Sequence, residues 1–342
     1  MTLMTLGKTG IVCDRNGFGA LPIQRVETAK AIEILRRALD GGITYFDTAR
    51  LYSDSEEKLG LAFAGMRDKI FLATKTPATT PDAFWRDLET SLTKLKTDYI
   101  DVYQFHCAAK SFAPDDGTGM YECMLEAKKQ GKIRHIGLTA HLLGVARDCV
   151  ESGLYETLQY PLSYLSSDDE IAMVRRGTEL GMGLVAMKGL AGGLITNAAA
   201  ASAFLAQFPG VLPIWGIQRD KELDDFLGFV NHPVSMTPEL ALFIEQDKKE
   251  LVGEFCRGCG YCMPCPEGIT IWQSARMSLM LRRAPSAHWL TPEIQEMMKA
   301  VERCKHCGAC AKKCPYGLNT PELLAKNYED YKKVLSGEIK TQ

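Results

Sequence analysis

Two short runs near the end of the sequence hold eight of its twelve cysteines. The second run ends in Cys-Pro and has the C-x2-C-x2-C-x3-C-P spacing that is typical of iron–sulfur cluster ligands. Its ligand candidates are Cys304, Cys307, Cys310 and Cys314. The first run has the same form with one residue fewer before its last cysteine, and contains Cys256, Cys259, Cys262 and Cys265. In such runs three cysteines surround one cluster, while the fourth reaches a neighbouring cluster.

Crosswise pairing of the two runs uses every cysteine in them. One [4Fe–4S] cluster would then be bound by Cys256, Cys259, Cys262 and Cys314. The other would be bound by Cys304, Cys307, Cys310 and Cys265. The alternative is zinc, which also takes four thiolates at this spacing, although a zinc site needs neither the third cysteine nor the Cys-Pro ending. The other four cysteines are scattered, and we expect them to be small buried hydrophobic residues.

Four ionisable residues follow apolar, strand-like runs in the first third of the chain. They are Asp47, Tyr52, Lys75 and His106. Each alone has an ordinary structural explanation, such as a buried ion pair or a core histidine. Together they could perform acid catalysis, because a cation beside a phenol lowers its pKa from the usual value of about 10. Tyr52 would donate a proton to a carbonyl oxygen, Lys75 oriented by Asp47 would assist it, and His106 would polarise the oxygen.

Repeated β/α units are expected to position these side chains. From Val12 to about Asn231, short apolar runs alternate with helical periodicity, and eight units can be counted. The predicted strands are Asn16–Leu21, Ile43–Asp47, Ile70–Thr74, Tyr99–Phe105, Ile133–Leu138, Thr157–Tyr160, Gly183–Met187 and Leu212–Ile214. The first predicted helix, Thr28–Leu39, would bury Ile32, Leu35 and Leu39 on one face. Because no dinucleotide glycine fingerprint follows the first strand, a closed barrel is favoured over an open sheet.

The β/α pattern stops after His232-Pro233, and helical stretches then enclose the cysteine runs. The predicted fold class is therefore α/β: a (β/α)8 TIM barrel followed by a mainly helical, ferredoxin-like iron–sulfur domain. We expect the barrel to span residues 1–236 and the cluster domain residues 237–342.

The sequence resembles the aldo-keto reductase family, specifically members fused to a C-terminal ferredoxin-like 4Fe-4S domain. The resemblance covers nearly the whole chain and rests on Leu6-Gly-Lys-Thr-Gly10, Phe46-Asp-Thr-Ala49, Tyr52, Glu56 to Gly60, Lys75, His106, Gly131-Lys-Ile-Arg134, Ile136-Gly137, Gln159-Tyr-Pro161 and Gly192-Gly193. It implies that Asp47, Tyr52, Lys75 and His106 form the catalytic tetrad. It also implies a nicotinamide cofactor, NADP(H) more often than NAD(H), with Gln159 near its carboxamide.

Several cofactor positions depart from the family pattern. Thr139-Ala140 stands where the family usually has Ser-Asn, and Met187, followed by Lys188, stands where an aromatic residue is common. Arg219 is the best candidate to bind a 2′-phosphate, and Lys221 lies two residues further on. The alternative for Arg219 and Lys221 is a solvated helix start.

Composition limits the class of partner. The formal net charge is -2, with 46% hydrophobic and 24% charged residues, which is typical of a globular protein without a basic surface. We therefore expect no nucleic-acid partner, and no apolar run approaches the roughly 20 residues of a membrane span. A cytoplasmic location is the resulting expectation.

Two functions remain open at this point. The first is an enzyme that reduces a small carbonyl compound, or oxidises an alcohol, by hydride transfer from a nicotinamide, with clusters that are structural or carry electrons. The second is a single-electron transfer protein, in which the clusters connect a ferredoxin-type partner with a substrate or a bound flavin. No flavin-binding motif is evident in the sequence, but a flavin stays a candidate cofactor.

Overall fold

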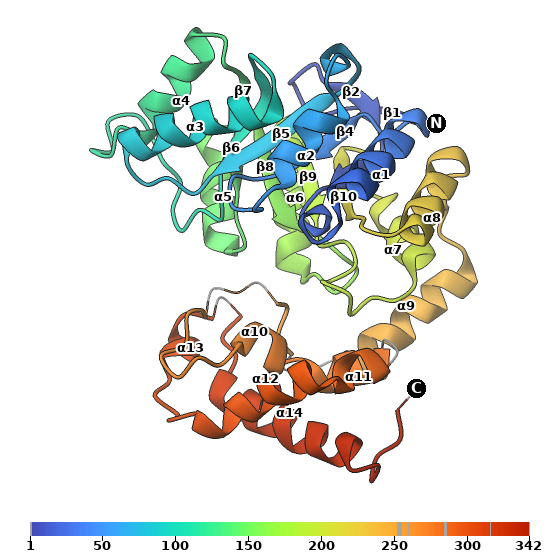
Figure 1. Cartoon of the computed structure of the whole chain (residues 1–342). Helices are drawn as coiled ribbons and strands as arrows, with labels where there is room; N and C mark the ends of the chain where they lie inside the picture. Colours follow the sequence, from blue (N-terminus) through green and yellow to red (C-terminus); the bar gives the residue numbers. More distant parts are fainter. Residues whose placement is uncertain are drawn as a thin grey trace. The chain divides into compact units, whose positions relative to one another are not determined.

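The computed structural model divides the chain into two compact units (Figure 1). The first comprises Met1–Gly189 and Ala199–Leu240, and the second comprises Leu190–Ala198 and Ala241–Gln342. The structure describes residues 2–251, 255–258, 260, 262–283, 286–314 and 316–341. Of residues 250 and 283 it describes the backbone alone. Each unit is described separately below.

The first unit is built around a closed barrel of eight parallel strands, in the order β10-β3-β4-β5-β6-β7-β8-β9. The strands are β3 (Gly17–Gly19), β4 (Tyr45–Asp47), β5 (Phe71–Thr76), β6 (Ile100–Phe105), β7 (Ile133–Thr139), β8 (Thr157–Pro161), β9 (Gly183–Met187) and β10 (Val211–Gly216). Each overlaps one of the eight predicted strands. The predicted (β/α)8 barrel is therefore confirmed.

Helices connect successive strands of the barrel (Figure 1). They are α1 (Thr28–Asp40), α2 (Ser55–Ala62), α3 (Pro81–Leu95), α4 (Met120–Lys129), α5 (Leu143–Ser152), α6 (Asp168–Glu179), α7 (Ala198–Leu205) and α8 (Asp220–Asn231). Helix α1 buries a different face from the predicted one: Ala31, Ile34, Leu35 and Ala38. Ile32 and Leu39 are only half-buried. Two of these four residues are alanines, which a search for large apolar side chains does not detect.

An antiparallel hairpin, which the sequence did not predict, precedes the barrel. Its strands are β1 (Leu3–Thr5) and β2 (Val12–Asp14). Four of its residues, Met4, Leu6, Ile11 and Cys13, belong to a buried cluster with side chains from the barrel strands, among them Tyr45. Because Tyr45 is the first residue of β4, the hairpin covers the amino-terminal end of the barrel.

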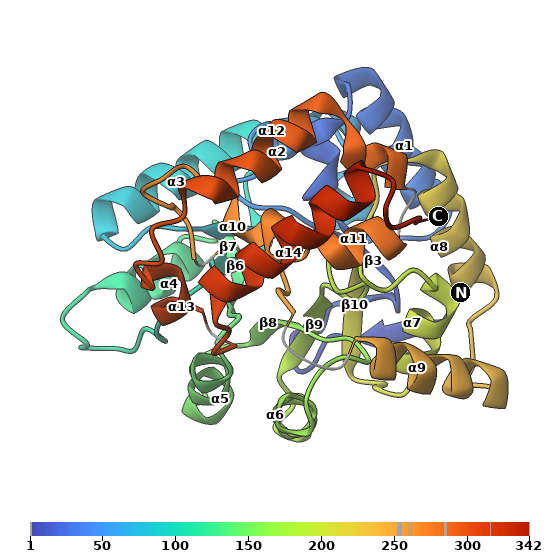
Figure 2. The same cartoon turned by 90° about the horizontal axis from the view of Figure 1, so that it is seen from below.

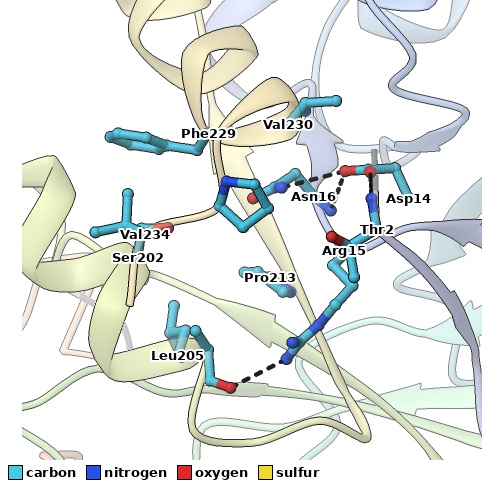
Figure 3. A pocket seen from close by; sticks show the side chains of 12 residues that line it. Thr2, Asp14, Arg15, Asn16, Ser202, Leu205, Pro213, Phe229, Val230 and Val234 are labelled. Atoms are coloured by element: carbon cyan, nitrogen blue, oxygen red, sulfur yellow. Dashed lines mark hydrogen bonds between the residues drawn. The ribbon is translucent and has the colours of Figure 1, made fainter. Parts of the chain in front are cut away.

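A pocket lies beside this hairpin, with about 450 Å³ of empty volume (Figure 3). Its polar side chains bind groups of the protein itself. Asp14 accepts hydrogen bonds from the backbone N–H of Thr2 (3.2 Å) and from the backbone N–H of Asn16 (2.9 Å). Arg15 Nη2 donates to the carbonyl oxygen of Ala206 (3.3 Å). The bond from Arg15 joins the hairpin to the segment between Leu205 and Val211. The polar side chains of this pocket thus stabilise the fold.

The described part of the second unit consists of helices joined by turns and loops, and it contains no strand. Its helices are α9 (Pro238–Glu250), which begins in the first unit, α10 (Ile271–Ser274), α11 (Met277–Arg283), α12 (Pro292–Lys299), α13 (Ala309–Lys312) and α14 (Thr320–Leu335). Helix α14 contacts α10, α11, α12 and α13, and Figure 2 shows it running the length of this unit. Its core includes Ile269, Ile271, Val301 and Leu324, together with cysteines of both runs. The mainly helical character predicted for this region is confirmed.

Candidate active site and iron–sulfur sites

The carboxyl ends of three neighbouring strands bring the predicted tetrad together. Asp47 is the last residue of β4, Lys75 lies near the end of β5, and His106 directly follows β6. Tyr52 lies in the connection between β4 and α2. Since all strands of the barrel are parallel, these ends meet on one rim, where the active sites of β/α barrels lie.

Lys75 and Asp47 form a buried ion pair. Lys75 Nζ lies 2.7 Å from each carboxylate oxygen of Asp47 and donates to the carbonyl oxygen of Thr48 at 2.6 Å. Burial lowers the pKa of Lys75 and raises the pKa of Asp47, while each charge opposes the shift of its partner. Two amides also reach the carboxylate, because Gln104 Nε2 and Gln159 Nε2 each lie 3.4 Å from one of its oxygens.

Tyr52 lies beside both Lys75 and His106. Its ring meets the His106 ring edge-on, with centroids 5.6 Å apart, and Lys75 Nζ lies 5.4 Å from the Tyr52 ring centroid. In the protein without substrate or cofactor, the pKa of Tyr52 is raised and not lowered. Burial raises this pKa well above its usual value, and the negative charge of Asp47 raises it further. The phenol therefore keeps its proton at neutral pH, as a proton donor must before it reacts.

His106 is neutral at physiological pH. Burial lowers the pKa of its imidazole to about 3, and the charges of Lys75 and His141 act in the same direction. Its Nδ1 atom is buried and has no hydrogen-bond partner among the residues that the structure describes. The imidazole is thus able to hydrogen-bond a carbonyl oxygen without adding a charge to the site.

A buried carboxylate holds the segment that carries Tyr52. Glu56, in the first turn of α2, accepts hydrogen bonds from Thr74 Oγ1 (2.7 Å) and Ser91 Oγ (2.6 Å) and forms an ion pair with Arg50. Arg50 lies between Asp47 and Tyr52 in the sequence, so this pair restrains the connection from its middle. Glu56 entered the sequence analysis only as part of a family motif, because nothing in the pattern distinguishes it from the exposed Glu57.

Gln104 is a site residue that the sequence reasoning missed. Besides Asp47 it contacts Gln159, with its Nε2 atom 3.2 Å from Gln159 Oε1. Gly137, on the next strand, leaves room for it, because a Cβ at that position would lie 2.8 Å from Gln104 Cγ. A polar residue inside an apolar strand was the available signal, since a barrel interior admits such a side chain only with partners.

Four of the predicted cofactor residues lie at this same end of the barrel. Thr139 ends β7, Gln159 lies in β8, and Met187 ends β9, followed by Lys188 in a left-handed conformation (φ +60°). Thr139 Oγ1 accepts a hydrogen bond from the backbone N–H of Cys107 (2.7 Å). These four residues belong to β7, β8 and β9 or directly follow β9, and these strands continue the barrel from β6.

The other two predicted cofactor residues lie at the start of α8 and have acidic partners on that helix. Arg219 Nη2 lies 2.7 Å from Glu222 Oε1, and Lys221 Nζ lies 3.0 Å from Asp225 Oδ2. Their side chains are 73% and 85% exposed, so these ion pairs contribute little to stability. The binding of a 2′-phosphate by Arg219 stays a prediction.

Two cavities in the second unit are lined by cysteines. The larger, with about 540 Å³ of empty volume, is lined by Cys262, Cys265, Cys304, Cys307 and Cys310. The smaller, with about 330 Å³, is lined by Cys256, Cys262 and Cys314. Each cavity therefore draws sulfur atoms from both runs. The remaining candidate ligand, Cys259, lies outside the described residues.

The surroundings of these cysteines fit a cluster of iron and sulfide. All the candidate ligands are cysteines, the residues that bind such clusters. The backbone N–H of Gly258 donates to Cys256 Sγ at 3.3 Å, a contact that stabilises negative charge on sulfur. Among the described residues, no three His, Cys, Asp or Glu side chains are grouped closely enough to hold a single metal ion.

The closed parallel barrel, with a Tyr–Lys–Asp–His constellation on its carboxyl rim, defines a β/α-barrel oxidoreductase. The family model of the aldo/keto reductases matches residues 16–204, and a 4Fe-4S dicluster domain model matches residues 255–319. The chain belongs to the aldo/keto reductase family and carries a C-terminal 4Fe-4S dicluster domain.

Known proteins resemble part of the chain. An uncharacterized oxidoreductase of Bacillus subtilis, YqkF, is 30% identical over 196 residues, which are 50% of this chain and 63% of that protein. The aldo-keto reductase YhdN of the same organism is 36% identical over 158 residues, 41% of this chain and 47% of that protein. The chain thus spans about half to two thirds of the length of these relatives. The holo form of a Bacillus halodurans aldo-keto reductase superposes with a TM-score of 0.64 at 22% identity, covering 72% of this chain and 96% of that one.

In the described part of the chain, no helix is both long enough and apolar enough to cross a bilayer.

Proposed function

We propose that this protein reduces the carbonyl group of a small molecule, or oxidises the corresponding alcohol, with NADPH or NADH as cofactor. One observation carries the proposal: the buried Lys75–Asp47 pair lies beside a protonated Tyr52 and a neutral His106 on the rim of the barrel. This arrangement supplies a proton donor, a hydrogen-bonding imidazole and a fixed cation within one site.

A bound reduced nicotinamide would supply a hydride to the carbonyl carbon. The carbonyl oxygen then takes up negative charge, and Tyr52 donates its phenolic proton to that oxygen, so that one hydride and one proton complete the alcohol. His106 orients the oxygen as an uncharged hydrogen-bonding group. Lys75 stabilises the phenolate that develops on Tyr52, and Asp47 fixes the position of the ammonium. Alcohol oxidation uses the same residues in reverse.

The cofactor assignment is part of the same proposal. Gln159 and Thr139 would bind the nicotinamide end, with Met187 and Lys188 beside it. Arg219, assisted by Lys221, would bind a 2′-phosphate, which favours NADP(H) over NAD(H). Arg219 supports this role because its guanidinium is exposed and a phosphate can replace its carboxylate partner.

We assign two [4Fe–4S] clusters to the domain of residues 237–342, with residues 1–236 as the catalytic barrel. Cys256, Cys259, Cys262 and Cys314 would bind one cluster. Cys304, Cys307, Cys310 and Cys265 would bind the other. The sets of cysteines that line the two cavities support this crosswise assignment.

The cysteine-lined cavities also favour a second candidate function. In that reaction the clusters pass single electrons between a ferredoxin-type partner and a substrate or flavin, and no hydride from a nicotinamide is needed. The exposure of Cys307 and Lys305 supports access by such a partner.

Anaerobic turnover experiments separate the two candidates. Protein with its clusters intact should oxidise NADPH in the presence of simple aldehydes, and Tyr52→Phe should abolish this activity. Tyr45→Phe is the matched control, because Tyr45 is buried in the same barrel and its hydroxyl has no partner among the described residues. Absence of aldehyde turnover in the wild type, together with reduction driven by a viologen dye, would replace the hydride mechanism by the single-electron one.

A further inference from the structure

Arg276 is a buried arginine that no part of the proposed reaction uses. It lies between α10 and α11 in the second unit, and only 7% of its surface is exposed. Arginine is among the residues least often buried without a partner of opposite charge. No carboxylate lies within ion-pair distance of Arg276 among the residues that the structure describes.

The guanidinium is instead directed at the first cysteine run. A Cβ at Gly258 would lie 2.7 Å from Arg276 Nη1, so the arginine occupies the space beside the backbone between Cys256 and Cys259. The backbone N–H of Gly258 donates to Cys256 Sγ at 3.3 Å, so the residue that Arg276 lies against is itself bonded to a candidate ligand. Arg276 therefore lies beside the backbone that carries a ligand of the proposed first cluster.

A second contact fixes the guanidinium in this position. Arg276 Nη2 donates to the carbonyl oxygen of Gly192 at 2.8 Å, within the segment Leu190–Ala198 of the same unit. A Cβ at Gly192 would lie 2.9 Å from Nη1, so a glycine is needed there as well. The Nε atom of Arg276 is buried without a hydrogen-bond partner in the described part of the chain. Gly192 and Gly258 thus leave space for a buried cation beside the first cysteine run.

We propose that Arg276 is a positioning residue that raises the reduction potential of the cluster bound by Cys256, Cys259, Cys262 and Cys314. This inference rests on the proposed cluster ligation. A cluster held by four thiolates is an anion, and reduction adds one electron to it, so a nearby buried cation stabilises the reduced state more than the oxidised state. The effect is strong where water is excluded, and Arg276 meets that condition.

The test is a redox titration of the full chain under anaerobic conditions. Iron and sulfide are counted first, and dithionite then reduces each protein stepwise while electron paramagnetic resonance follows the reduced clusters. In Arg276→Gln we expect the equilibrium constant for reduction of one cluster to fall about tenfold, which is about 59 mV for a one-electron couple. The other cluster should keep its potential. Arg276→Lys, which keeps the charge, should move the potential by less than half as much.

Arg282→Gln is the matched control. Arg282 lies in α11, is more exposed and pairs with Asp330 at 2.6 Å, so its loss should leave both potentials unchanged. An unchanged potential in Arg276→Gln, or equal shifts in Arg276→Gln and Arg276→Lys, would overturn the electrostatic role.

If Arg276→Gln takes up no iron, Arg276→Lys decides the question. A loaded Arg276→Lys with a potential near that of the wild type supports the requirement for charge, and an iron-free Arg276→Lys contradicts it. Wild-type protein without iron and sulfide would instead refute the cluster ligation itself, so the two failures are distinguishable.

Discussion

Lys75 Nζ lies 2.7 Å from both carboxylate oxygens of Asp47, and both side chains are buried. The ammonium of Lys75 also lies near Tyr52. Removal of this ammonium should therefore affect the chemical step. We expect Lys75→Met to lower kcat by about 10²- to 10⁴-fold, the usual contribution of proton-transfer catalysis, with a small change in KM. Steady-state kinetics with an aldehyde measure this effect.

Lys58→Met is the control for that variant. Lys58 is also buried, but it donates to the carbonyl oxygen of Val26 at 2.6 Å, in the connection between β3 and α1, and it is no member of the tetrad. This variant should lose stability but keep most of its kcat. Equal losses of kcat in the two variants would argue against a specific role for Lys75.

The low pKa of His106 gives a prediction for stability. A folded-state pKa of about 3, against about 6.5 in the unfolded chain, means that the unfolded state binds more protons between these values. The free energy of unfolding therefore decreases as the pH falls from 7 towards 3. Urea denaturation at pH 7 and pH 5 should show a smaller loss for His106→Gln than for the wild type. His232→Gln, at an exposed position, should behave as the wild type, and an identical slope in His106→Gln would contradict the prediction.

Glu56 should contribute to the stability of the folded barrel. Its removal in Glu56→Ala leaves Arg50 without its ion pair and two hydroxyl groups without an acceptor. The loss of one partner from a buried pair costs about 3 kcal/mol, and urea denaturation can measure it. Glu57→Ala, at the exposed neighbouring position, should stay within about 0.5 kcal/mol of the wild type.

Arg219 should determine the preference for NADPH. In Arg219→Ala the KM for NADPH should rise roughly tenfold, as expected for one charge-assisted hydrogen bond, while the KM for NADH stays unchanged. Initial rates with each cofactor provide the comparison. Arg176→Ala serves as control, because Arg176 is likewise exposed and paired with a carboxylate, that of Glu151. An equal rise of the KM for NADPH and the KM for NADH in Arg219→Ala would show that Arg219 does not bind the 2′-phosphate.

Cys314 should be required for the cluster of the first run. Cys314→Ser is expected to lose about half of the bound iron, because only one of the two clusters takes this ligand. Cys123→Ser replaces a buried cysteine of α4 outside the runs and should keep the full iron content. Complete retention of iron in Cys314→Ser would refute the crosswise assignment.

The sequence predicted the barrel well because its strands are buried and therefore read as continuous apolar runs. The tetrad was accessible for a related reason: three of its members directly end or follow such runs. The hairpin β1–β2 was missed because its strands are three residues long, which is too short for an alternating pattern.

Other features depend on contacts that no local pattern contains. Gln104 reaches Asp47 across the barrel interior only because Gly137 leaves room on the adjacent strand. Arg276 hydrogen-bonds the carbonyl oxygen of Gly192, 84 residues earlier in the sequence, and an arginine in a helical stretch is ordinarily expected at the surface. In both cases the partner comes from a distant part of the chain, so three-dimensional structure was needed to find it.

The two cysteine-lined cavities each take sulfur atoms from both runs. In the sequence, the helices α10, α11 and α12 lie between these two runs. Two clusters ligated in this way would act as a double cross-link around these helices. Oxidative loss of iron would then remove the cross-links between the two cysteine runs. Air exposure should therefore increase protease cleavage in the segment between the runs. The redox centres would thus also make the lifetime of the folded domain sensitive to oxygen.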